Sequence, residues 1–460
     1  MADGSIILHL GLGSFHRAHQ AIYLQRLIEL GETEWSIAAA NIRPDMLPVQ
    51  DLLARQHGRY TVETVTPEGE RAYQEVTAIR QVVPWDETLA GVVVLGARRE
   101  TRIISFTVTE AGYYLTPKNE LDTGFPDLAS DLGQGTRRTI YGALTAILRE
   151  RMRAGAGPVT LLSCDNLRAN GERFHAGFTQ FLRARGEAAL LEWAEAHSTA
   201  PCSMVDRITP RPSSDVAVRV QNACGWDDRC PVMAESFIQW VIEDRFAAGR
   251  PPWERAGAEM VRSVAPYEEA KIRVLNGSHS AIAWAGALRG YQYIHQGVND
   301  PAVRRIAFDY VTDDVLPCLA PSPLDLGAYR DTVLGRFSSP HIRDTIQRVA
   351  ADGYSKLPGY VVPTIQDRLS RGEPIESVAM LPALFLRFLQ RWGRDELPFA
   401  YQDQAMDEAA TRAMLKDPAP LSAFCRDRVL WGALAGEAAL EAAVARAFRR
   451  VQAWENAHGS

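Results

Sequence analysis

The chain has 460 residues, of which 46% are hydrophobic and 23% charged, and this length predicts two large globular domains. Its formal net charge is −6, and the sequence contains no run of lysine or arginine residues. This composition excludes a basic surface for nucleic acid, because binding to phosphates needs clustered positive charge.

The chain opens with the pattern of a dinucleotide site. A short apolar strand is predicted at residues 6–10, the turn GLG follows it, and an apolar-periodic helix is predicted over residues 18–30. This order brings backbone N–H groups and a helix N-terminus to a pyrophosphate. A complete fingerprint has a third glycine where this chain has His16. Either the helix stays farther from the strand, or His16 points at the phosphates. The candidate cofactor-binding residues here are Gly11, Gly13, Phe15 and His16.

The second strand is predicted at residues 35–40 and ends at Asn41. At this place the fingerprint expects an acidic residue that binds the ribose hydroxyls of adenosine. Asp45 comes only after a proline, and Arg43 could accept a 2′-phosphate. We expect NAD as the cofactor, with Asn41 as a candidate contact and an ordinary turn as the alternative.

Two further segments complete this half of the sheet. Residues 58–79 alternate around the turn PEGE and predict an inserted antiparallel hairpin. Residues 102–108 predict a buried strand, and Thr109 and Glu110 follow it. Ligands lie at the carboxyl edge of an open parallel sheet. Thr109 and Glu110 are therefore candidates to border the nicotinamide, although a plain loop is equally compatible.

Asn166 follows another predicted strand, at residues 159–163, which comes after a helix over 136–153. Its amide could hold an alkoxide at the same carboxyl edge. The alternative is an N-cap for a helix that begins just after it.

The patterning changes from strands to helices after Pro251-Pro252-Trp253. Before it, residues 204–210 and 231–237 indicate further strands or connections. We expect an α/β protein in which residues 1–255 form a Rossmann-type dinucleotide-binding domain and residues 256–460 a mostly α-helical domain. The helical segments are predicted at residues 271–288, 302–316, 341–351, 376–392 and 435–451.

The stretch YEEAKIRVLNGSH, residues 267–279, carries an amine, an amide and an imidazole. In an α-helix at about 100° per residue, Lys271, Asn276 and His279 lie on one side, within roughly 140° of each other. A desolvated Lys271 could accept a proton, Asn276 could donate to an alkoxide, and His279 could hold a hydroxyl proton. This set predicts the oxidation of an alcohol, and the alternative is an amphipathic structural helix.

Tyr267 and Lys271 also fit the motif Y-x-x-x-K of short-chain dehydrogenases, in which tyrosine is the acid/base. We favour Lys271 as the base because Asn276 and His279 share its helix. Farther along, Arg348 and Lys356 flank the turn at residues 351–354 and could bind the hydroxyls or carboxylate of a small substrate. Solvated surface charge is their alternative.

The six cysteines are scattered and form no C-x-x-C pair, which argues against a disulfide framework and against a zinc alcohol dehydrogenase. Reduced thiols in a cytoplasm are the simplest interpretation. The N-terminal apolar stretch is too short for a secretion signal, and no apolar run approaches a membrane span. We expect a cytoplasmic protein without membrane contact.

Four motifs together resemble the polyol-specific long-chain dehydrogenases, the mannitol dehydrogenase family, over essentially the whole chain. They are GLGSFHRAHQA at residues 11–21, SCDNLRANG at 163–171, MVDRITP at 204–210 and KIRVLNGSH at 271–279.

The resemblance implies a zinc-independent mechanism with Lys271 as general base. It implies that Asn166 and Asn276 polarise the oxygen, that His279 binds the neighbouring hydroxyl, and that Glu268 exchanges protons with solvent. Arg348 and Lys356 match positions that line the substrate pocket.

It also implies a monomer or weak oligomer that acts with NAD on a polyol or ketose. D-arabinitol is favoured as the substrate, and mannitol or a ketohexuronate is the alternative. A dinucleotide-binding sensor without turnover is the competing class of function.

Overall fold

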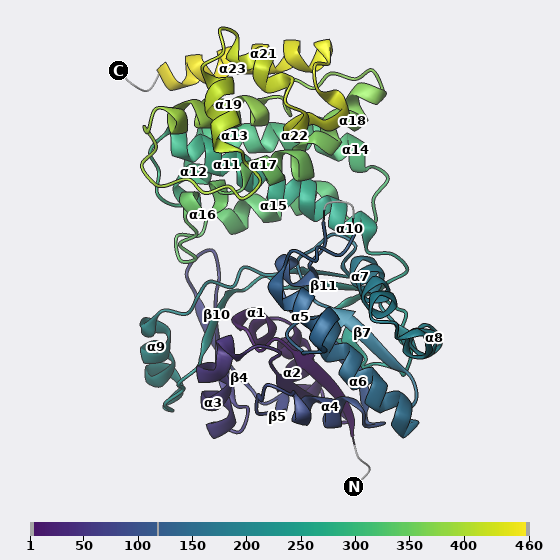
Figure 1. The fold of residues 1–460 in the computed structure, drawn as a ribbon. Helices are drawn as coiled ribbons and strands as arrows, with labels where there is room; N and C mark the ends of the chain where they lie inside the picture. Colours follow the sequence, from purple (N-terminus) through teal and green to yellow (C-terminus); the bar gives the residue numbers. More distant parts are fainter. Residues whose placement is uncertain (1–3, 117–118, 457–460) are drawn as a thin grey trace. The chain divides into compact units, whose positions relative to one another are not determined.

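The computed structural model describes residues 4–116 and 119–456. The chain divides into two compact units, one of residues 1–66 and 70–265 and the other of residues 67–69 and 266–460. Figure 1 shows strands in the first unit and helices throughout the second. The domain boundary that we drew after residue 255 stays a prediction.

The first unit is built on a six-stranded sheet with the order β5-β2-β1-β6-β7-β8, in which every neighbouring pair is parallel. Taken in chain order, this is the doubly wound arrangement of a Rossmann fold, as the sequence predicts. The order reverses between β1 and β6. The strands are β1 (Ser5–Leu10), β2 (Trp35–Ala40), β5 (Ile79–Val82), β6 (Thr101–Phe106), β7 (Val159–Ser163) and β8 (Ser198–Thr199).

Helices cover both faces of this sheet, so its strands read as continuous apolar runs. Ile7, Ile37 and Ile103 belong to the core on one face, and the residues that follow them, such as Leu8 and Ile104, belong to the core on the other. The main helices of the unit are α1 (Ser14–Ala18), α2 (Gln20–Glu29), α3 (Leu47–Arg55), α4 (Ala90–Gly96), α5 (Pro126–Gln134), α6 (Ile140–Ala154), α7 (Asn170–Ala184), α8 (Ala188–His197) and α9 (Ser214–Cys224).

Two three-stranded sheets complete the first unit. The predicted hairpin is confirmed as the antiparallel pair β3 (Tyr60–Val65) and β4 (Arg71–Val76), which joins β10 (Val232–Glu235). Ile79 does not belong to the hairpin, because it begins β5 of the main sheet. The other small sheet contains β9 (Ser203–Asp206), β11 (Gln239–Glu243) and β12 (Glu259–Val261).

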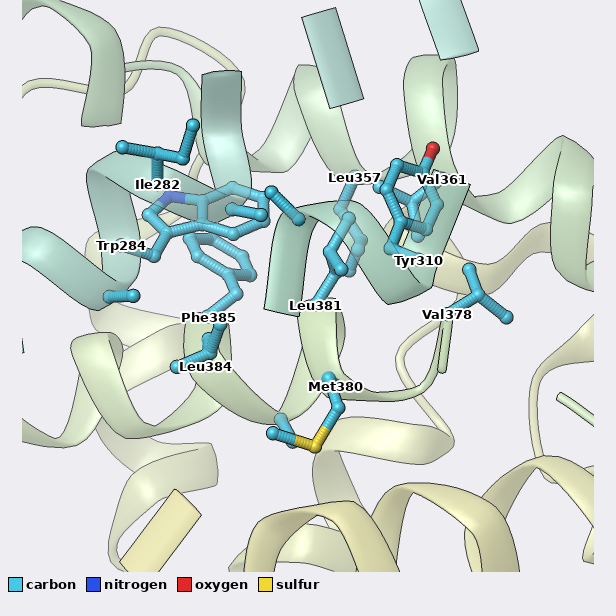
Figure 2. Close-up of a cluster of buried hydrophobic side chains, with 14 of the residues drawn as sticks. Ile282, Trp284, Tyr310, Leu357, Val361, Val378, Met380, Leu381, Leu384 and Phe385 are labelled. Atoms are coloured by element: carbon cyan, nitrogen blue, oxygen red, sulfur yellow. The ribbon is translucent and has the colours of Figure 1, made fainter. Parts of the chain in front are cut away.

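The second unit is mostly helical, as predicted. Its core surrounds α11, whose side chains are apolar almost all round, and α19. The rings of Trp284 on α11 and Phe385 on α19 lie 4.8 Å apart, and Figure 2 shows them with Tyr310 and Leu357 in the same buried cluster. The helices are α10 (Ala265–Ala270), α11 (Gly277–Leu288), α12 (Ile294–Asn299), α13 (Pro301–Asp309), α14 (Leu316–Leu319), α15 (Leu326–Phe337), α16 (Ile346–Ala350), α17 (Gly353–Lys356), α18 (Val362–Ser370), α19 (Met380–Gly393), α20 (Glu408–Leu415), α21 (Pro420–Cys425), α22 (Arg428–Trp431) and α23 (Ala438–Asn456).

Three segments of this unit are π-helical, namely η4 (Lys271–Asn276), η5 (Tyr310–Val315) and η6 (Leu357–Val361). The α-helix predicted over residues 267–279 is therefore wrong at its centre. The helix predicted at residues 341–351 is also too long, since α16 covers only Ile346–Ala350. Within the part of the chain that the structure describes, no helix is both long and apolar enough to cross a membrane.

Candidate active site

A cleft of about 980 Å³ opens at the carboxyl edge of the main sheet of the first unit. Its walls are the segments that follow β1, β2, β6 and β7, so it lies where the strand order reverses. This is the place where doubly wound sheets bind nucleotides. The predicted residues that line it are Gly11, Gly13, Phe15, Asn41, Thr109, Glu110 and Asn166.

The two glycines of the turn serve different purposes. Gly11 has φ +120°, and a Cβ there would collide with the carbonyl of Thr107, so only glycine fits. A Cβ on Gly13 would meet nothing within 4 Å. Gly13 thus leaves open space on the cleft wall, where a ligand can approach the backbone.

His16 does not line the cleft, contrary to one of the two sequence interpretations. Its side chain is 1% exposed and stacks on His9, with the ring centroids 3.4 Å apart. His9 belongs to β1 and His16 to α1. The stacked imidazoles therefore lie between the helix and the strand, at the place where a third glycine would let the helix pack closer to the strand. Burial, reinforced by His9, lowers the pKa of His16 well below its usual value.

Asn41 holds the glycine turn against the end of β2. Its Oδ1 accepts a 2.7 Å hydrogen bond from the N–H of Leu12, and its Nδ2 donates to Gln50 at 3.1 Å. Both polar atoms are therefore engaged inside the protein, and a contact with ribose stays a prediction. Arg43, at the cleft wall, lies 3.3 Å from Asp45 and 2.9 Å from Asp127.

A carboxylate that the sequence analysis missed organises the wall at Thr109. Asp165 accepts hydrogen bonds from the N–H of Val108 at 3.1 Å, the N–H of Thr109 at 2.8 Å and the hydroxyl of Tyr113 at 2.9 Å. Thr109 has φ +65°, an uncommon conformation for a side-chain-bearing residue. Burial raises the pKa of Asp165 to about 6, and these three hydrogen bonds partly offset that shift. Its position immediately after a buried strand was the signal in the sequence.

Asn166 is exposed on the cleft wall next to Asp165. Helix α7 begins at Asn170 and its N-cap is Ala169, so the alternative of Asn166 as an N-cap is wrong. Asn166 lines the cleft at the edge where the sequence analysis expected a catalytic amide.

The second set of candidate residues lies on η4 and the start of α11. Lys271 is 7% exposed and Glu268, on the preceding turn, is 6% exposed. Asn276 ends the π segment, five residues after Lys271. In the i→i+5 pattern of a π-helix, residues five apart come closer to one face than in an α-helix. The π turn therefore places Lys271 and Asn276 nearer to one face of the helix than an α-helix would, and turns of this type are frequent at functional sites.

Tyr310 and Gly277 explain why the helix widens here. The hydroxyl of Tyr310 donates a 2.8 Å hydrogen bond to the carbonyl of Arg273, which lies inside the π segment. A Cβ on Gly277 would meet the ring of Tyr310 at 3.0 Å, so glycine gives the ring its place. Arg273 itself pairs with Glu269 and Asp367. These contacts stabilise the π turn on both of its sides.

His279, Arg348 and Lys356 gather around a second carboxylate that the sequence analysis missed. His279 Nε2 lies 3.2 Å from Asp344 Oδ2, and Arg348 Nε donates to Asp344 Oδ1 at 2.7 Å. Lys356 Nζ donates to the carbonyl of Val349 at 2.7 Å, and burial lowers the pKa of Lys356 to about 8. Asp344 and Arg348 are four residues apart with opposite charges, the spacing that could have indicated the pair.

Comparison with known proteins covers both units. The model of the mannitol dehydrogenase Rossmann domain matches residues 5–255, and that of the mannitol dehydrogenase C-terminal domain matches residues 263–452. A D-arabinitol 4-dehydrogenase of Ralstonia nicotianae is 57% identical over 99% of this chain and 98% of its own. A D-arabinitol 4-dehydrogenase of Klebsiella pneumoniae is 53% identical over 94% of each chain.

Solved structures agree with this assignment. Mannitol 2-dehydrogenase of Pseudomonas fluorescens, in a ternary complex with NAD and D-mannitol, has a TM-score of 0.83 and 33% identity, over 98% of this chain and 92% of its own. A D-sorbitol dehydrogenase in substrate-free form has a TM-score of 0.89 and 29% identity, over 99% and 97%. The chain therefore belongs to the mannitol dehydrogenase family and is an oxidoreductase that acts on CH–OH groups.

Proposed function

We propose that the chain is an NAD-dependent polyol dehydrogenase that oxidises D-arabinitol to D-xylulose. The assignment of D-arabinitol as the substrate rests on the 57% identity with a D-arabinitol 4-dehydrogenase over nearly the full length of both chains. Mannitol 2-dehydrogenases are more distant, at 35% identity for that of Pyrenophora tritici-repentis.

The residues of the cleft fit NAD. Its volume of about 980 Å³ is at the upper end for a small-molecule site. The open space at Gly13 allows the backbone of the turn to approach a pyrophosphate. Gly11, Phe15 and the wall at Thr109 and Glu110 are the other proposed contacts. When bound there, NAD supplies the acceptor for the hydride that leaves the alcohol carbon.

Lys271 is the proposed general base, which takes the proton of the reacting hydroxyl. Its burial supports this role, because a desolvated ammonium gives up its proton more readily than one in water. Asn166 and Asn276 are proposed to donate amide hydrogens to the oxygen as negative charge develops on it. Glu268, on the turn before Lys271, is the proposed route by which the proton reaches solvent.

His279 is proposed to bind the hydroxyl next to the reacting carbon. Lys356 is proposed to donate to a substrate hydroxyl, and Arg348 is proposed to line the substrate pocket, as the family resemblance implies. We also propose a cytoplasmic location for a monomer or weak oligomer. All six cysteines lie among the described residues and are free thiols, which suits a reducing compartment.

A substrate panel tests this function. We expect NADH formation with the highest kcat/KM for D-arabinitol among D-arabinitol, mannitol, sorbitol and xylitol, and weaker activity with NADP. A higher kcat/KM for mannitol would move the assignment to mannitol 2-dehydrogenase. A protein that binds NAD and oxidises none of these polyols would favour a sensor.

A further inference from the structure

Asp344 contacts two of the predicted substrate-binding residues at once. Its Oδ2 lies 3.2 Å from His279 Nε2, and its Oδ1 accepts a 2.7 Å hydrogen bond from Arg348 Nε. A second hydrogen bond, from Arg348 Nη2 to Oδ2 at 2.5 Å, makes the arginine pair bidentate. The side chain of Asp344 is 8% exposed and that of Arg348 is 67% exposed, so the carboxylate is shielded from water while the guanidinium reaches solvent.

The charges of this cluster are fixed near neutral pH. Burial alone would raise the pKa of Asp344, but His279 and Arg348 outweigh burial and lower it to about 2. Burial lowers the pKa of His279, and Asp344 offsets only part of that shift. The pair is therefore a carboxylate beside a neutral imidazole.

These charges determine which nitrogen of His279 carries the proton. Nε2 lies 3.2 Å from the carboxylate but makes no aligned hydrogen bond to it in this structure. A carboxylate has no proton to donate, so its charge favours the tautomer with the N–H on Nε2. Nδ1 then carries a lone pair and can only accept. The ring cannot easily turn, because it stacks on Phe337 with the centroids 4.3 Å apart and an interplanar angle of 17°. His279 is thus prepared to accept a hydrogen bond from a hydroxyl.

The same carboxylate changes what Arg348 can recognise. Both carboxylate oxygens of Asp344 accept from the guanidinium in the paired geometry that a substrate carboxylate would otherwise use. Lys356 is different, because its charged amine has three donors and, among the described residues, donates one hydrogen bond, to Val349. Arg348 also keeps N–H donors that can bind hydroxyls, but the paired edge that would bind a carboxylate is occupied and its charge is balanced.

We propose that Asp344 is a positioning residue with two effects: it holds His279 as an acceptor for the substrate hydroxyl beside the reacting carbon, and it balances Arg348 so that neutral polyols are preferred over polyol carboxylates. This inference rests on the proposed function and deepens it. It predicts that the loss of Asp344 changes the relative kcat/KM values of different substrates, which a general loss of stability would leave unchanged.

The first test compares wild type with Asp344→Asn on D-arabinitol and on its 3-deoxy and 5-deoxy analogues, which lack one or the other hydroxyl beside C4. Asparagine keeps the shape, but its amide can also donate, so it no longer fixes the proton of His279 on Nε2. For D-arabinitol we expect kcat/KM to fall by about tenfold or more, by analogy with the loss of the partners that orient metal-binding histidines. For the analogue that lacks the hydroxyl bound by His279, the fall should be less than about threefold.

Asp314→Asn is the matched control. Asp314 is also a buried carboxylate of the second unit, 3.2 Å from Arg368, and neither residue is a candidate for substrate binding. We expect the ratio of kcat/KM between D-arabinitol and each analogue to stay as in wild type for this variant, whatever the change in its unfolding temperature. If Asp344→Asn lowers kcat/KM by the same factor for all three substrates, or for none, the positioning role is wrong.

The second test needs no turnover. D-arabinonate is titrated calorimetrically into the enzyme with NAD, using wild type, Asp344→Asn and the double variant Asp344→Asn/Arg348→Gln. We expect the Kd of Asp344→Asn for this carboxylate to be about tenfold lower than that of wild type, because Arg348 is released. The double variant should lose this gain. Equal Kd values for wild type and Asp344→Asn would contradict the effect on Arg348.

These outcomes are separable from the proposed function. If the wild-type enzyme prefers another polyol, the assignment to D-arabinitol fails, and the same comparison on that polyol and its deoxy analogues still decides the role of Asp344. If D-arabinitol is preferred and the deoxy comparison shows no difference, only the role of Asp344 fails.

Discussion

The backbone N–H of Thr109 donates a 2.8 Å hydrogen bond to Oδ1 of Asp165. The contact joins the segment after β6 to the segment after β7, which are two of the segments that line the cleft. Thr109 is held at φ +65° by this contact and by its neighbour at Val108. The carboxylate offers one acceptor oxygen to each of these two N–H groups.

We predict that Asp165→Asn weakens NADH binding. The amide offers one acceptor oxygen where two N–H groups need partners, so the backbone at Thr109 is held less firmly at the cleft wall. We expect the Kd for NADH to rise by roughly tenfold, which corresponds to about 1.4 kcal/mol of binding free energy. NADH fluorescence titration measures this. Asp244→Asn, which removes a surface carboxylate paired with Arg250, should leave the Kd unchanged. An unaltered Kd in Asp165→Asn would mean that the wall at Thr109 does not contact the cofactor.

The same substitution should change how stability depends on pH. The pKa of Asp165 is about 6 in the folded protein, above its ordinary value of 3.8. Its contribution to stability is therefore fully present below pH 3.8 and is lost as the pH rises through 6, by about 3 kcal/mol at most. Relative to wild type, Asp165→Asn should gain stability between pH 4 and pH 7. The unfolding temperatures of both proteins are measured over this pH range. A constant difference between wild type and Asp165→Asn would contradict the raised pKa of Asp165.

The acidic partners of Arg43 should disfavour NADP. With Asp45 at 3.3 Å and Asp127 at 2.9 Å, the guanidinium is already neutralised, and the carboxylates at the cleft wall repel a 2′-phosphate. The double variant Asp45→Asn/Asp127→Asn should raise kcat/KM for NADP by about tenfold or more, since each full charge near a phosphate contributes about 1 kcal/mol. Steady-state kinetics with both cofactors measures this. If the ratio of kcat/KM for NAD to kcat/KM for NADP does not change, the 2′-hydroxyl of the adenosine ribose does not lie near these two carboxylates.

We predict that Tyr310→Phe disturbs the π turn. The substitution removes the donor that satisfies the Arg273 carbonyl, and an unsatisfied buried acceptor costs about 1–3 kcal/mol. Relaxation of the turn would move Lys271 relative to Asn276, so kcat for D-arabinitol should fall while the Kd for NADH stays constant. Tyr291→Phe, which removes a hydroxyl bound to Asp300, serves as the control. Unchanged kcat in Tyr310→Phe would separate the π turn from catalysis.

The sheet was predictable because each strand is a short apolar run followed by chemistry that belongs at a carboxyl edge. The segments at residues 35–40 and 159–163 were predicted with the bounds that the structure has. His16 was harder, because its role depends on His9, whose side chain the strand pattern alone does not distinguish from core. Their stacking joins two elements of the chain, and only packing in three dimensions reveals it.

The second unit exposes a different limit of sequence reasoning. Periodicity identified the helix that carries Lys271, but the residue that widens it, Tyr310, lies far along the chain on η5. Asp344 was missed for a related reason. It falls just before α16, within a segment whose apolar pattern predicted a longer helix, and its partner His279 comes from α11. Long-range contacts decided both cases.

We propose above all that Lys271 is the general base in the oxidation of a polyol by NAD. NADH formation with D-arabinitol at alkaline pH, in wild type, Lys271→Ala and Tyr267→Phe, tests it most directly. We predict that Lys271→Ala loses activity by about a hundredfold or more while its Kd for NADH is unchanged, and that Tyr267→Phe keeps most of its activity. An inactive Tyr267→Phe beside an active Lys271→Ala would contradict the account and make the tyrosine the base.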